Sequence, residues 1–523
     1  MPKITKDRLF ELLSARHVNN PYSKLADIPP PTSFKDIDIA TKRIKKAILE
    51  NETITIVGDY DVDGIVSTTI MLDFFKQINI KVNHIIPNRF EHGYGLSTKI
   101  VDLIEKGLVI TVDNGISAYE ASLKLKEKNI DLIITDHHTV GEKIPQALAI
   151  INPKQKDCTF PFKDICGAQV AWYLCAAIKK EMNLNVNMSD YLDLLCIAIV
   201  ADIMPMTALN YTITKQGLKK LKSSSREAFK LLNSILSKES LISDDIGFFI
   251  APKLNSAGRM DDATIALDFL LSEDSFSANE SLSLLDELNN YRKTLQEDIS
   301  NKANSKIDKN KNAIIVWDEN WHEGVIGIVA SKLSNLYKKP AFIFTVQEND
   351  IAKGSVRANS NINLYELISK TSHLLIGFGG HKNAAGLSLK LENIEEFEKI
   401  INEELENFKD DLHIEIDTLG ELDVSSVDLE FLSIIEGFEP YGLENHRPIF
   451  KISNVNLVKY DLIGRDKNHL KLTLDSNGVI FEAIKFNDSN KNIPHHNLNL
   501  IVSVAKNEFK GVITPQFLIQ EIL

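Results

Sequence analysis

The sequence predicts an α/β protein in which a parallel-sheet domain is joined by a helical connector to a second α/β domain, followed by a C-terminal β-barrel. Short β-branched runs alternate with amphipathic stretches from residue 53 to about 150, and the same alternation returns near residue 312. From about residue 447, apolar and polar residues alternate in short runs, which is typical of a small barrel. A chain of 523 residues is also too long for one compact core.

In the first domain we expect strands at 53–57, 81–86, 108–112 and 131–135, with helices at 64–78 and 117–128. Strands that alternate with helices in this way pair in parallel. Residues 165–300 have a helix-favouring composition with serine-rich breaks, and they form the connector. In the second domain we expect a strand at 312–317, a helix at 325–337, a strand at 341–345 and a further strand near 386–389.

The composition excludes a membrane-spanning or disordered chain. Apolar residues make up 44% and charged residues 25%, without an apolar run of 18 residues. The N-terminal residues lack the apolar segment of a secretion signal, so we expect a cytoplasmic protein. The four cysteines have no C-x-x-C spacing and lie in mostly apolar sequence, so we expect buried, reduced thiols: Cys158, Cys166, Cys175 and Cys196.

The net charge of −13 argues against a nucleic-acid partner only at first sight. Residues 410–446 contain eleven Asp or Glu and no Lys or Arg, which leaves −2 for the rest of the chain. Residues 447–523 contain ten basic and seven acidic residues. One acidic segment therefore dominates the total charge, and a phosphate-rich ligand remains compatible with the other parts.

Acidic and imidazole side chains follow three of the expected strands, at the edge where open α/β sheets bind ligands. They are Asp59, Asp61 and Asp63 after the first strand, Asp113 after the third, and Asp136, His137 and His138 after the fourth. Asp202 ends another apolar run and could add a further carboxylate. Two carboxylates about 4 Å apart repel by roughly 4 kcal/mol at an effective dielectric constant near 20, so such a cluster favours a metal ion.

This mixture of oxygen and imidazole ligands suits Mn²⁺ or Mg²⁺ better than Zn²⁺, and the acids suffice for two ions. Two such ions can clamp a phosphoryl group and activate a water, so phosphoester hydrolysis is the chemistry that we expect. In the second α/β domain, Gly354-Ser-Val-Arg357 and Gly379-Gly380-His381 could bind phosphate through backbone N–H groups and the Arg357 guanidinium.

Each motif also has a structural explanation. Residues 59–64 fit the start of an EF-hand loop, but position twelve is Ile70 instead of the required Glu, and a strand precedes the motif instead of a helix. Asp113-Asn-Gly115 taken alone is typical of a turn. The histidine pair could lie in a helix cap or in the core, and Asp202 alone could be a cap.

Taken together, the motifs resemble those of the DHH phosphoesterase family, and within it the bacterial single-stranded-DNA exonucleases. The resemblance spans nearly the whole chain and rests on PPPTSFKD (29–36), GDYDVDG (58–64), PNR (87–89) with GYG (93–95), DNG (113–115), DHH (136–138), VAD (200–202), PKLNSAGR (252–259), WHEGVIG (321–327) and GH (380–381). Two positions depart from the expected pattern: Gln169 replaces a small residue, and Phe378 replaces a glycine before Gly379.

The resemblance implies a DHH domain and a DHH-associated domain followed by an oligonucleotide-binding (OB) fold. The expected boundaries are an N-terminal segment at 1–45, the DHH catalytic domain at 46–205, the helical connector at 206–307, the DHH-associated domain at 308–408, and an acidic linker with the OB fold at 409–523. It implies 5′-to-3′ release of 5′-mononucleotides from single-stranded DNA by two Mn²⁺ or Mg²⁺ ions, in DNA repair and recombination. Single-stranded-DNA-binding protein and a repair helicase would be partners.

The resemblance also implies roles for individual residues. The metal ligands would be Asp59, Asp61, Asp63, Asp113, His137 and Asp202, and the catalytic motif would be Asp136, His137 and His138. The substrate phosphates would contact Arg89, Asn255, Arg259, Ser355, Arg357 and His381.

Two other functions remain open from the sequence. A DHH phosphodiesterase acting on dinucleotides or cyclic dinucleotides would resemble only the first two domains, so the chain length opposes it. A non-catalytic scaffold that binds nucleic acid or replication proteins would have lost its metal site, whereas the acidic set is complete here.

Overall fold

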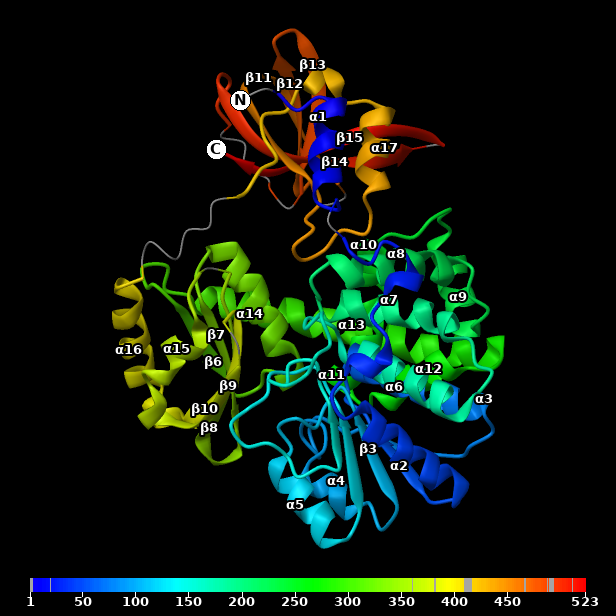
Figure 1. The fold of residues 1–523 in the computed structure, drawn as a ribbon. Coiled ribbons are helices and arrows are strands. Elements are labelled where there is room, and N and C mark those ends of the chain that lie inside the picture. The colour runs from blue at the N-terminus through cyan, green and yellow to red at the C-terminus, as the bar shows by residue number, and fades with distance from the viewer. Residues whose placement is uncertain are drawn as a thin grey trace. The chain divides into compact units, whose positions relative to one another are not determined.

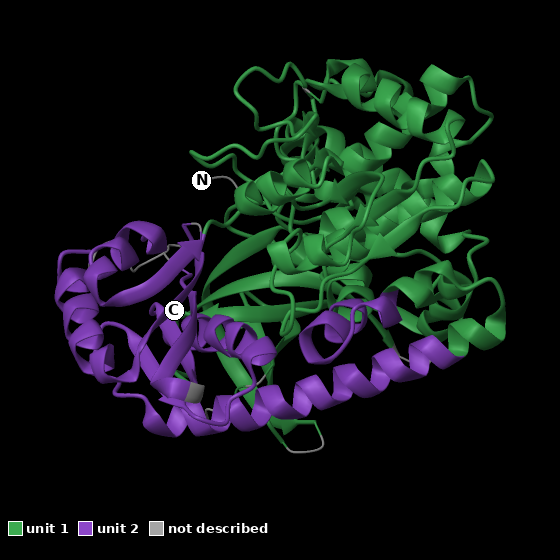
Figure 2. Ribbon diagram, turned by 90° about the horizontal axis from the view of Figure 1, so that it is seen from below, with its two compact units in different colours: residues 1–252, 267–279, 417–523 green, residues 253–266, 280–416 purple. Residues whose placement is uncertain are grey.

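The computed structural model describes residues 3–18, 20–359, 361–380, 382–408, 416–464, 467–486, 488, 493–509 and 511–523. The chain forms two compact units, which Figure 2 shows in separate colours. Unit 1 comprises residues 1–252, 267–279 and 417–523, and unit 2 comprises residues 253–266 and 280–416. The expected connector is thus divided between the two units.

The first sheet, in unit 1, is entirely parallel and has the strand order β2-β1-β3-β4-β5. Its strands are β1 (Ile54–Val57), β2 (Asn83–Ile85), β3 (Leu108–Val112), β4 (Asp131–Thr135) and β5 (Ala149–Ile151). The central strands β1 and β3 are buried along their whole length, which explains their continuous apolar and β-branched sequences. The four predicted strands are present, and β5 is an addition that three residues were too few to reveal.

Helices cover both faces of this sheet, as a doubly wound fold requires. Figure 1 shows α4 (Thr98–Asp102) and α5 (Tyr119–Glu127) on one side, with α2 (Ile37–Leu49), α3 (Val62–Gln77) and α6 (Gly167–Met182) on the other. The next helix, α7 (Leu192–Ala201), packs against α3 and against α8. The further helices of this part are α8 (Ala208–Lys222), α9 (Glu227–Leu236), α10 (Ser243–Asp245) and a π-helical turn (Ile246–Ile250).

Three helices follow in the region of the expected connector: α11 (Ala251–Met260), α12 (Thr264–Leu271) and the long α13 (Ser275–Lys306). The second sheet, in unit 2, has the order β6-β7-β8-β10-β9, with β6 parallel to β7 and the other pairs antiparallel. Its strands are β6 (Ile314–Asp318), β7 (Ala341–Gln347), β8 (Ile351–Arg357), β9 (Leu375–Gly380) and β10 (Ala384–Lys390). Its helices are α14 (Glu323–Tyr337), which packs on β7 and β8, α15 (Leu364–Ser369) and α16 (Ile394–Glu406).

The C-terminal part of unit 1 is a closed barrel of the order β11-β12-β13-β15-β14. Its strands are β11 (Ile449–Ile463), β12 (His469–Ser476), β13 (Val479–Lys485), β14 (Leu498–Phe509) and β15 (Val512–Ile522). Two helices from outside the barrel sequence complete its core: Leu9 and Leu13 of α1 (Lys6–Ala15) and Phe431 of α17 (Leu429–Gly437) are fully buried in one cluster with Phe450. The described part of the acidic stretch, from residue 416, therefore contributes to this domain's core.

The fold class that we predicted is confirmed: a parallel α/β sheet, a second α/β domain and a C-terminal barrel. All four cysteines are free and buried, as expected. Within the described ranges, no helix has both the length and the apolar character needed to cross a bilayer.

Candidate metal centre

The turn from β1 into α3 presents three carboxylates. Asp61 is the N-cap of α3, and its Oδ1 accepts a hydrogen bond from the Gly64 N–H at 3.1 Å. Gly64 allows the turn to close on itself, because a Cβ at this position would lie 2.5 Å from the Cβ of Asp59. Asp59 and Asp63 are buried on either side of the cap residue.

Asp63 is held by the N-terminus of a second helix. Its carboxylate accepts hydrogen bonds from the N–H groups of Gly167, at 2.6 Å, and Ala168, at 2.8 Å, in the first turn of α6. Helix N-termini stabilise negative charge. Burial and the nearby Asp61 carboxylate nevertheless outweigh these hydrogen bonds and raise the pKa of Asp63 to about 6. The Asp63 carboxylate is therefore rigidly placed but poorly neutralised by the protein.

Asp113 follows β3 in a left-handed backbone conformation, with φ of 62°. Its neighbour Asn114 is fully buried and ties two strands together, because its Nδ2 donates to Val57 O at 3.0 Å and to Val112 O at 2.9 Å. Tyr94 O–H donates to the backbone oxygen of Asp113 at 3.3 Å. The Asp-Asn-Gly motif is thus a cross-linked part of the sheet edge, and more than a surface turn.

Asp136 organises the loop after β4. Its Oδ2 accepts from the Ile116 N–H at 2.8 Å, and its Oδ1 accepts from the backbone N–H groups of His137 and His138. The Nδ1 atom of His138 also lies 2.7 Å from Asp136 Oδ1. Burial opposes ionisation of Asp136, but these contacts, led by that of the His138 ring, keep its pKa below the usual value. Burial would lower the pKa of His138, but Asp136 raises it to about 9, so this ring is protonated at neutral pH.

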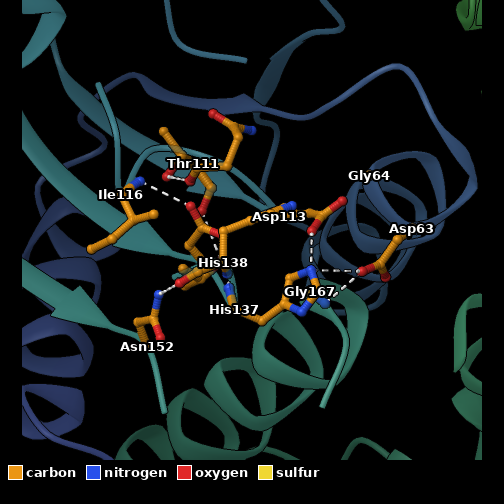
Figure 3. Close-up of polar contacts among 12 residues, drawn as sticks. Asp63, Gly64, Thr111, Asp113, Ile116, His137, His138, Asn152 and Gly167 are labelled. Atoms are coloured by element: carbon orange, nitrogen blue, oxygen red, sulfur yellow. Dashed lines mark hydrogen bonds and ion pairs between the residues drawn. The ribbon is translucent and has the colours of Figure 1, made fainter. Parts of the chain in front are cut away.

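The ring of His137 points toward the carboxylates. Its Nε2 atom lies 3.2 Å from Asp113 Oδ1, 3.5 Å from Asp202 Oδ2 and 3.7 Å from Asp63 Oδ2, and Figure 3 shows the ring between Asp63 and Asp113. Burial and the charge of His138 lower the pKa of His137 to about 3. His137 is therefore a neutral imidazole, the form that binds metal ions.

Several buried polar atoms in this cluster lack hydrogen bonds, counting the residues that the structure describes. They are Asp113 Oδ1, Asp202 Oδ2 and both ring nitrogens of His137. Burial also raises the pKa of Asp113 and Asp202 well above the usual value, with the neighbouring Asp63 carboxylate as the next cause. Unpaired buried acceptors are costly, and divalent cations would satisfy the two carboxylate oxygens and the Nε2 atom of His137.

Three groups of ligand atoms lie within 4.8 Å of one another: Asp59, Asp61 and Asp113; Asp63, His137 and Asp202; and Asp113, His137 and His138. Asp59, Asp61 and Asp113 form one candidate ligand set, and Asp63, His137 and Asp202 form the other. Because Asp113 Oδ1 and His137 Nε2 lie 3.2 Å apart, these two sets adjoin, and the arrangement is compatible with two neighbouring ions. The donors are carboxylate oxygens and imidazole, with no thiolate among these groups, which fits Mn²⁺ or Mg²⁺. At the edge of this cluster the guanidinium carbon of Arg89 lies 4.4 Å from the centre of the Tyr60 ring.

Three of the residues expected to contact phosphate lie around the first turns of α14, namely Arg259, Ser355 and Arg357. Arg259 Nη1 donates to Gly324 O at 3.4 Å, and a Cβ on Gly324 would lie 2.1 Å from the Arg259 backbone oxygen. A Cβ on Gly327 would lie 3.0 Å from Ser355 Oγ and 3.3 Å from Arg357 Nη2. Glycines on α14 thus allow its close approach to α11 and β8.

Arg357 is a partly buried cation beside these first turns of α14. Its Nη1 donates to Ser355 Oγ at 3.2 Å and to Val356 O at 2.8 Å, and burial lowers its pKa. In the described part of the chain it forms no ion pair with a carboxylate. Asn255 lies four residues before Arg259 on the same helix, whereas His381 lies outside the described residues. Phe378 contacts Tyr365, with ring centres 5.3 Å apart.

Sequence reasoning missed three residues that shape the centre. Gly167 and Asn114 support the ligands through backbone and amide hydrogen bonds, and Asn152 donates to His138 O at 3.0 Å. A glycine directly before a predicted helix could have marked Gly167 as a helix N-terminus facing an acid. Nothing local distinguishes Asn152 from a surface asparagine, because its partner is fourteen residues away.

Three family models match separate parts of the chain. The DHH family N-terminal domain matches residues 53–199, the DHHA1 domain matches residues 310–407, and the RecJ OB domain matches residues 418–521.

Curated relatives match over nearly the whole chain. The chain is 34% identical over 518 residues to the single-stranded-DNA-specific exonuclease RecJ of Bacillus subtilis, a match that covers 96% of this chain and 65% of that protein. It is 33% identical over 553 residues to the RecJ of Haemophilus influenzae, covering 99% of this chain and 95% of that protein.

Solved structures agree with these matches. The crystal structure of RecJ from Thermus thermophilus in complex with Mn²⁺ superposes with a TM-score of 0.85 at 26% identity, covering 99% of this chain and 76% of that one. A structure of the same protein in complex with Mg²⁺ gives a TM-score of 0.80 at 25% identity, covering 99% of this chain and 74% of that one. These metal-bound structures of a relative confirm the cofactors that the sequence predicts, Mn²⁺ or Mg²⁺. The chain belongs to the RecJ family of metal-dependent exonucleases within the DHH proteins.

Proposed function

We propose that this chain is a single-stranded-DNA-specific exonuclease that removes 5′-mononucleotides in the 5′-to-3′ direction by two-metal hydrolysis, in DNA repair and recombination. The observation that carries the proposal is the convergence of Asp63, Asp113, His137 and Asp202 on one buried point with unpaired ligand atoms. The relatives named above are single-stranded-DNA-specific exonucleases, which supports the same substrate here.

In this proposal the metal ligands are Asp59, Asp61, Asp63, Asp113, His137 and Asp202. Bound divalent ions supply a deprotonated water and neutralise charge on the scissile phosphate. Asp136 does not offer Oδ1 for an ion, because that atom holds the backbone and the ring of His138. The protonated His138 ring then serves as a hydrogen-bond donor to a phosphate oxygen.

Phosphates of the strand are contacted by Arg89 beside the metal centre, by Asn255 and Arg259 of α11, and by Ser355, Arg357 and His381 in the second α/β domain. Arg357 supports this assignment, because it is partly buried and has no carboxylate partner among the described residues, and such an arginine favours an anionic ligand. The boundaries proposed for the domains are those expected from the sequence, and the matched ranges 53–199, 310–407 and 418–521 fall inside them. Cytoplasmic location is proposed as expected from the sequence, and partnership with single-stranded-DNA-binding protein and a helicase rests on the family resemblance.

A time course on end-labelled DNA tests the proposal. A 5′-phosphorylated single-stranded 20-mer, the corresponding duplex and a dinucleotide are incubated with Mn²⁺ or Mg²⁺, with Asp113→Ala as the inactive control. We expect mononucleotides from the single strand and successive shortening from its 5′ end. An intact 20-mer would reject the proposal, and preferential cleavage of the dinucleotide would indicate a small-substrate phosphodiesterase instead.

A further inference from the structure

The segment after β5 carries a lysine that is tied to the metal centre. Asn152, the first residue after β5, is fully buried, and its Nδ2 donates to the backbone oxygen of His138 at 3.0 Å. The Oδ1 of the same side chain accepts from the N–H of Lys154 at 2.8 Å. One amide therefore fixes the backbone of Lys154 relative to the histidine motif.

The positive charge of Lys154 acts on two residues of the metal centre, His137 and Asp202. It contributes to lowering the pKa of His137 and, against the larger effect of burial, also acts to lower that of Asp202. The Lys154 side chain is half-buried, and its ammonium group has no ion pair or hydrogen bond with the residues that the structure describes. A lysine nearby differs in this respect, because Lys163 Nζ donates to Cys158 O at 2.7 Å.

The charge balance of the centre calls for such a cation. Asp136 is paired with the ring of His138, whose Nδ1 lies 2.7 Å from its Oδ1, which leaves the carboxylates of Asp59, Asp61, Asp63, Asp113 and Asp202. Two divalent ions would leave one negative charge, and a phosphodiester would bring another. Arg89 and Lys154 are cations whose charges act on different members of this set, Arg89 on Asp59 and Lys154 on Asp202.

We propose that Lys154 binds a backbone phosphate of the DNA strand at the metal centre and thereby positions the scissile bond. This assignment rests on the proposed function. A lysine acts on phosphate as a compact point charge, so its contact contributes to affinity and to salt dependence without reading the base. Lys156 is a matched control, because it lies on the same segment, is exposed, and is not among the charges that act on His137 or Asp202.

The test compares Lys154→Met, Lys154→Arg and Lys156→Met with the wild type on a single-stranded 20-mer, between 50 and 200 mM salt. We expect Lys154→Met to raise KM about tenfold and to reduce the slope of log affinity against log salt by about 0.7, the value for one single-strand phosphate contact. Lys154→Arg should recover most of the affinity, and Lys156→Met should match the wild type. The Mn²⁺ concentration that half-stabilises the protein should be unchanged or lower in Lys154→Met.

Two results would overturn the assignment of Lys154: equal KM and salt slope for Lys154→Met and Lys156→Met, or a loss of Mn²⁺ binding that parallels the loss of activity. The second would make Lys154 a structural part of the centre. A wrong role for Lys154 is distinguished from a failure of the proposed function by measuring how tightly catalytically inactive variants bind the strand. If the wild type does not hydrolyse the strand, the proposed function fails. If Asp113→Asn binds the 20-mer equally well with and without the additional substitution Lys154→Met, only the role of Lys154 is overturned.

Discussion

Gly167 lies so close to Asp113 that a Cβ on the glycine would be 2.3 Å from the Oδ1 atom of the aspartate. The N–H of the same glycine donates to Asp63 at 2.6 Å. One residue at the start of α6 therefore contacts two of the candidate metal ligands. The helix can approach this closely only because position 167 has no side chain.

Gly167→Ala should disrupt the centre. The added methyl group must displace the Asp113 carboxylate or move α6 away from Asp63, at a cost of about 1–3 kcal/mol for overpacking a buried site. We expect the Mn²⁺ affinity to fall at least about tenfold, since 1.4 kcal/mol corresponds to a factor of ten. Thermal stability as a function of Mn²⁺ concentration measures this. Gly141→Ala is the control, because no atom lies within 4 Å of a Cβ at that position; equal Mn²⁺ midpoints for the two variants would contradict the prediction.

The carboxylate of Asp63 should make the metal-free protein less stable as the pH rises toward neutrality. Burial and Asp61 raise the pKa of Asp63 to about 6 in the folded protein, against about 3.9 for an unfolded aspartate. Between these values the folded protein binds a proton that the unfolded chain has released. The contribution of this group is therefore complete below about pH 4 and is lost as the pH rises through 6.

Mn²⁺ should accordingly stabilise the protein more at pH 7.5 than at pH 5.5, because ionised carboxylates bind the ion and protons compete with it at lower pH. At a concentration of 100 times Kd the gain is about 2.7 kcal/mol. Differential scanning fluorimetry with EDTA or Mn²⁺ at the two pH values measures the shift in Tm. Asp202→Asn should reduce the shift at pH 7.5, and a larger shift at pH 5.5 than at pH 7.5 in the wild type would contradict the interpretation.

The sequence was sufficient to predict the first sheet and the candidate metal ligands at its edge. The strands β1 and β3, and β4 after its exposed first residue, are buried runs rich in β-branched residues, and polar residues follow each of them closely. Parallel pairing then places these residues at one edge whatever the details of the loops. Asp113 and His137 could therefore be assigned to one site without coordinates.

Contacts between distant segments could not be predicted in this way. The packing of α1 on the barrel joins residues more than 400 positions apart, such as Leu9 and Phe450, and an amphipathic pattern does not specify which surface it covers. The same holds for the helix N-terminus that caps Asp63, because its donors lie 104 and 105 residues away. Local patterns identified the ligands, whereas the groups that orient them depend on tertiary structure.

Gln169, which departs from the family pattern, should be important for stability. It is fully buried, its Oε1 accepts from the Cys166 N–H at 3.0 Å, and its Nε2 donates to Asn210 Oδ1 at 3.0 Å. Gln169→Ala leaves both partners unsatisfied in the interior, which costs about 1–3 kcal/mol for each buried group. Urea denaturation measures the loss. The exposed Gln146→Ala should change the free energy of unfolding by less than about 0.5 kcal/mol, and a similar value for Gln169→Ala would show that these hydrogen bonds contribute little.

Ile203 occupies a backbone position that is unfavourable for its side chain. It follows Asp202 with φ of 53°, its N–H donates to Val200 O at 3.2 Å, and the Met204 N–H donates to Ile199 O at 3.1 Å. This pair of hydrogen bonds is the Schellman motif, in which the residue at the position of Ile203 is usually glycine or asparagine. The left-handed conformation costs a β-branched residue roughly 1–2 kcal/mol.

Ile203→Asn should therefore stabilise the protein by about 1 kcal/mol, because asparagine adopts this conformation more readily and the side chain it replaces is 68% exposed. Since the cap hydrogen bonds come from the backbone, Asp202 should keep its place in Ile203→Asn. We therefore expect kcat/KM to stay within about threefold of the wild type, as for other substitutions of exposed side chains. Urea denaturation and hydrolysis of the single-stranded 20-mer measure the two effects. Ile144→Asn, an exposed position without positive φ, should give no gain. If Ile203→Asn is more stable but loses most of its activity, the strained cap presents an apolar contact for the DNA strand beside Asp202, and the cost in stability is explained by function.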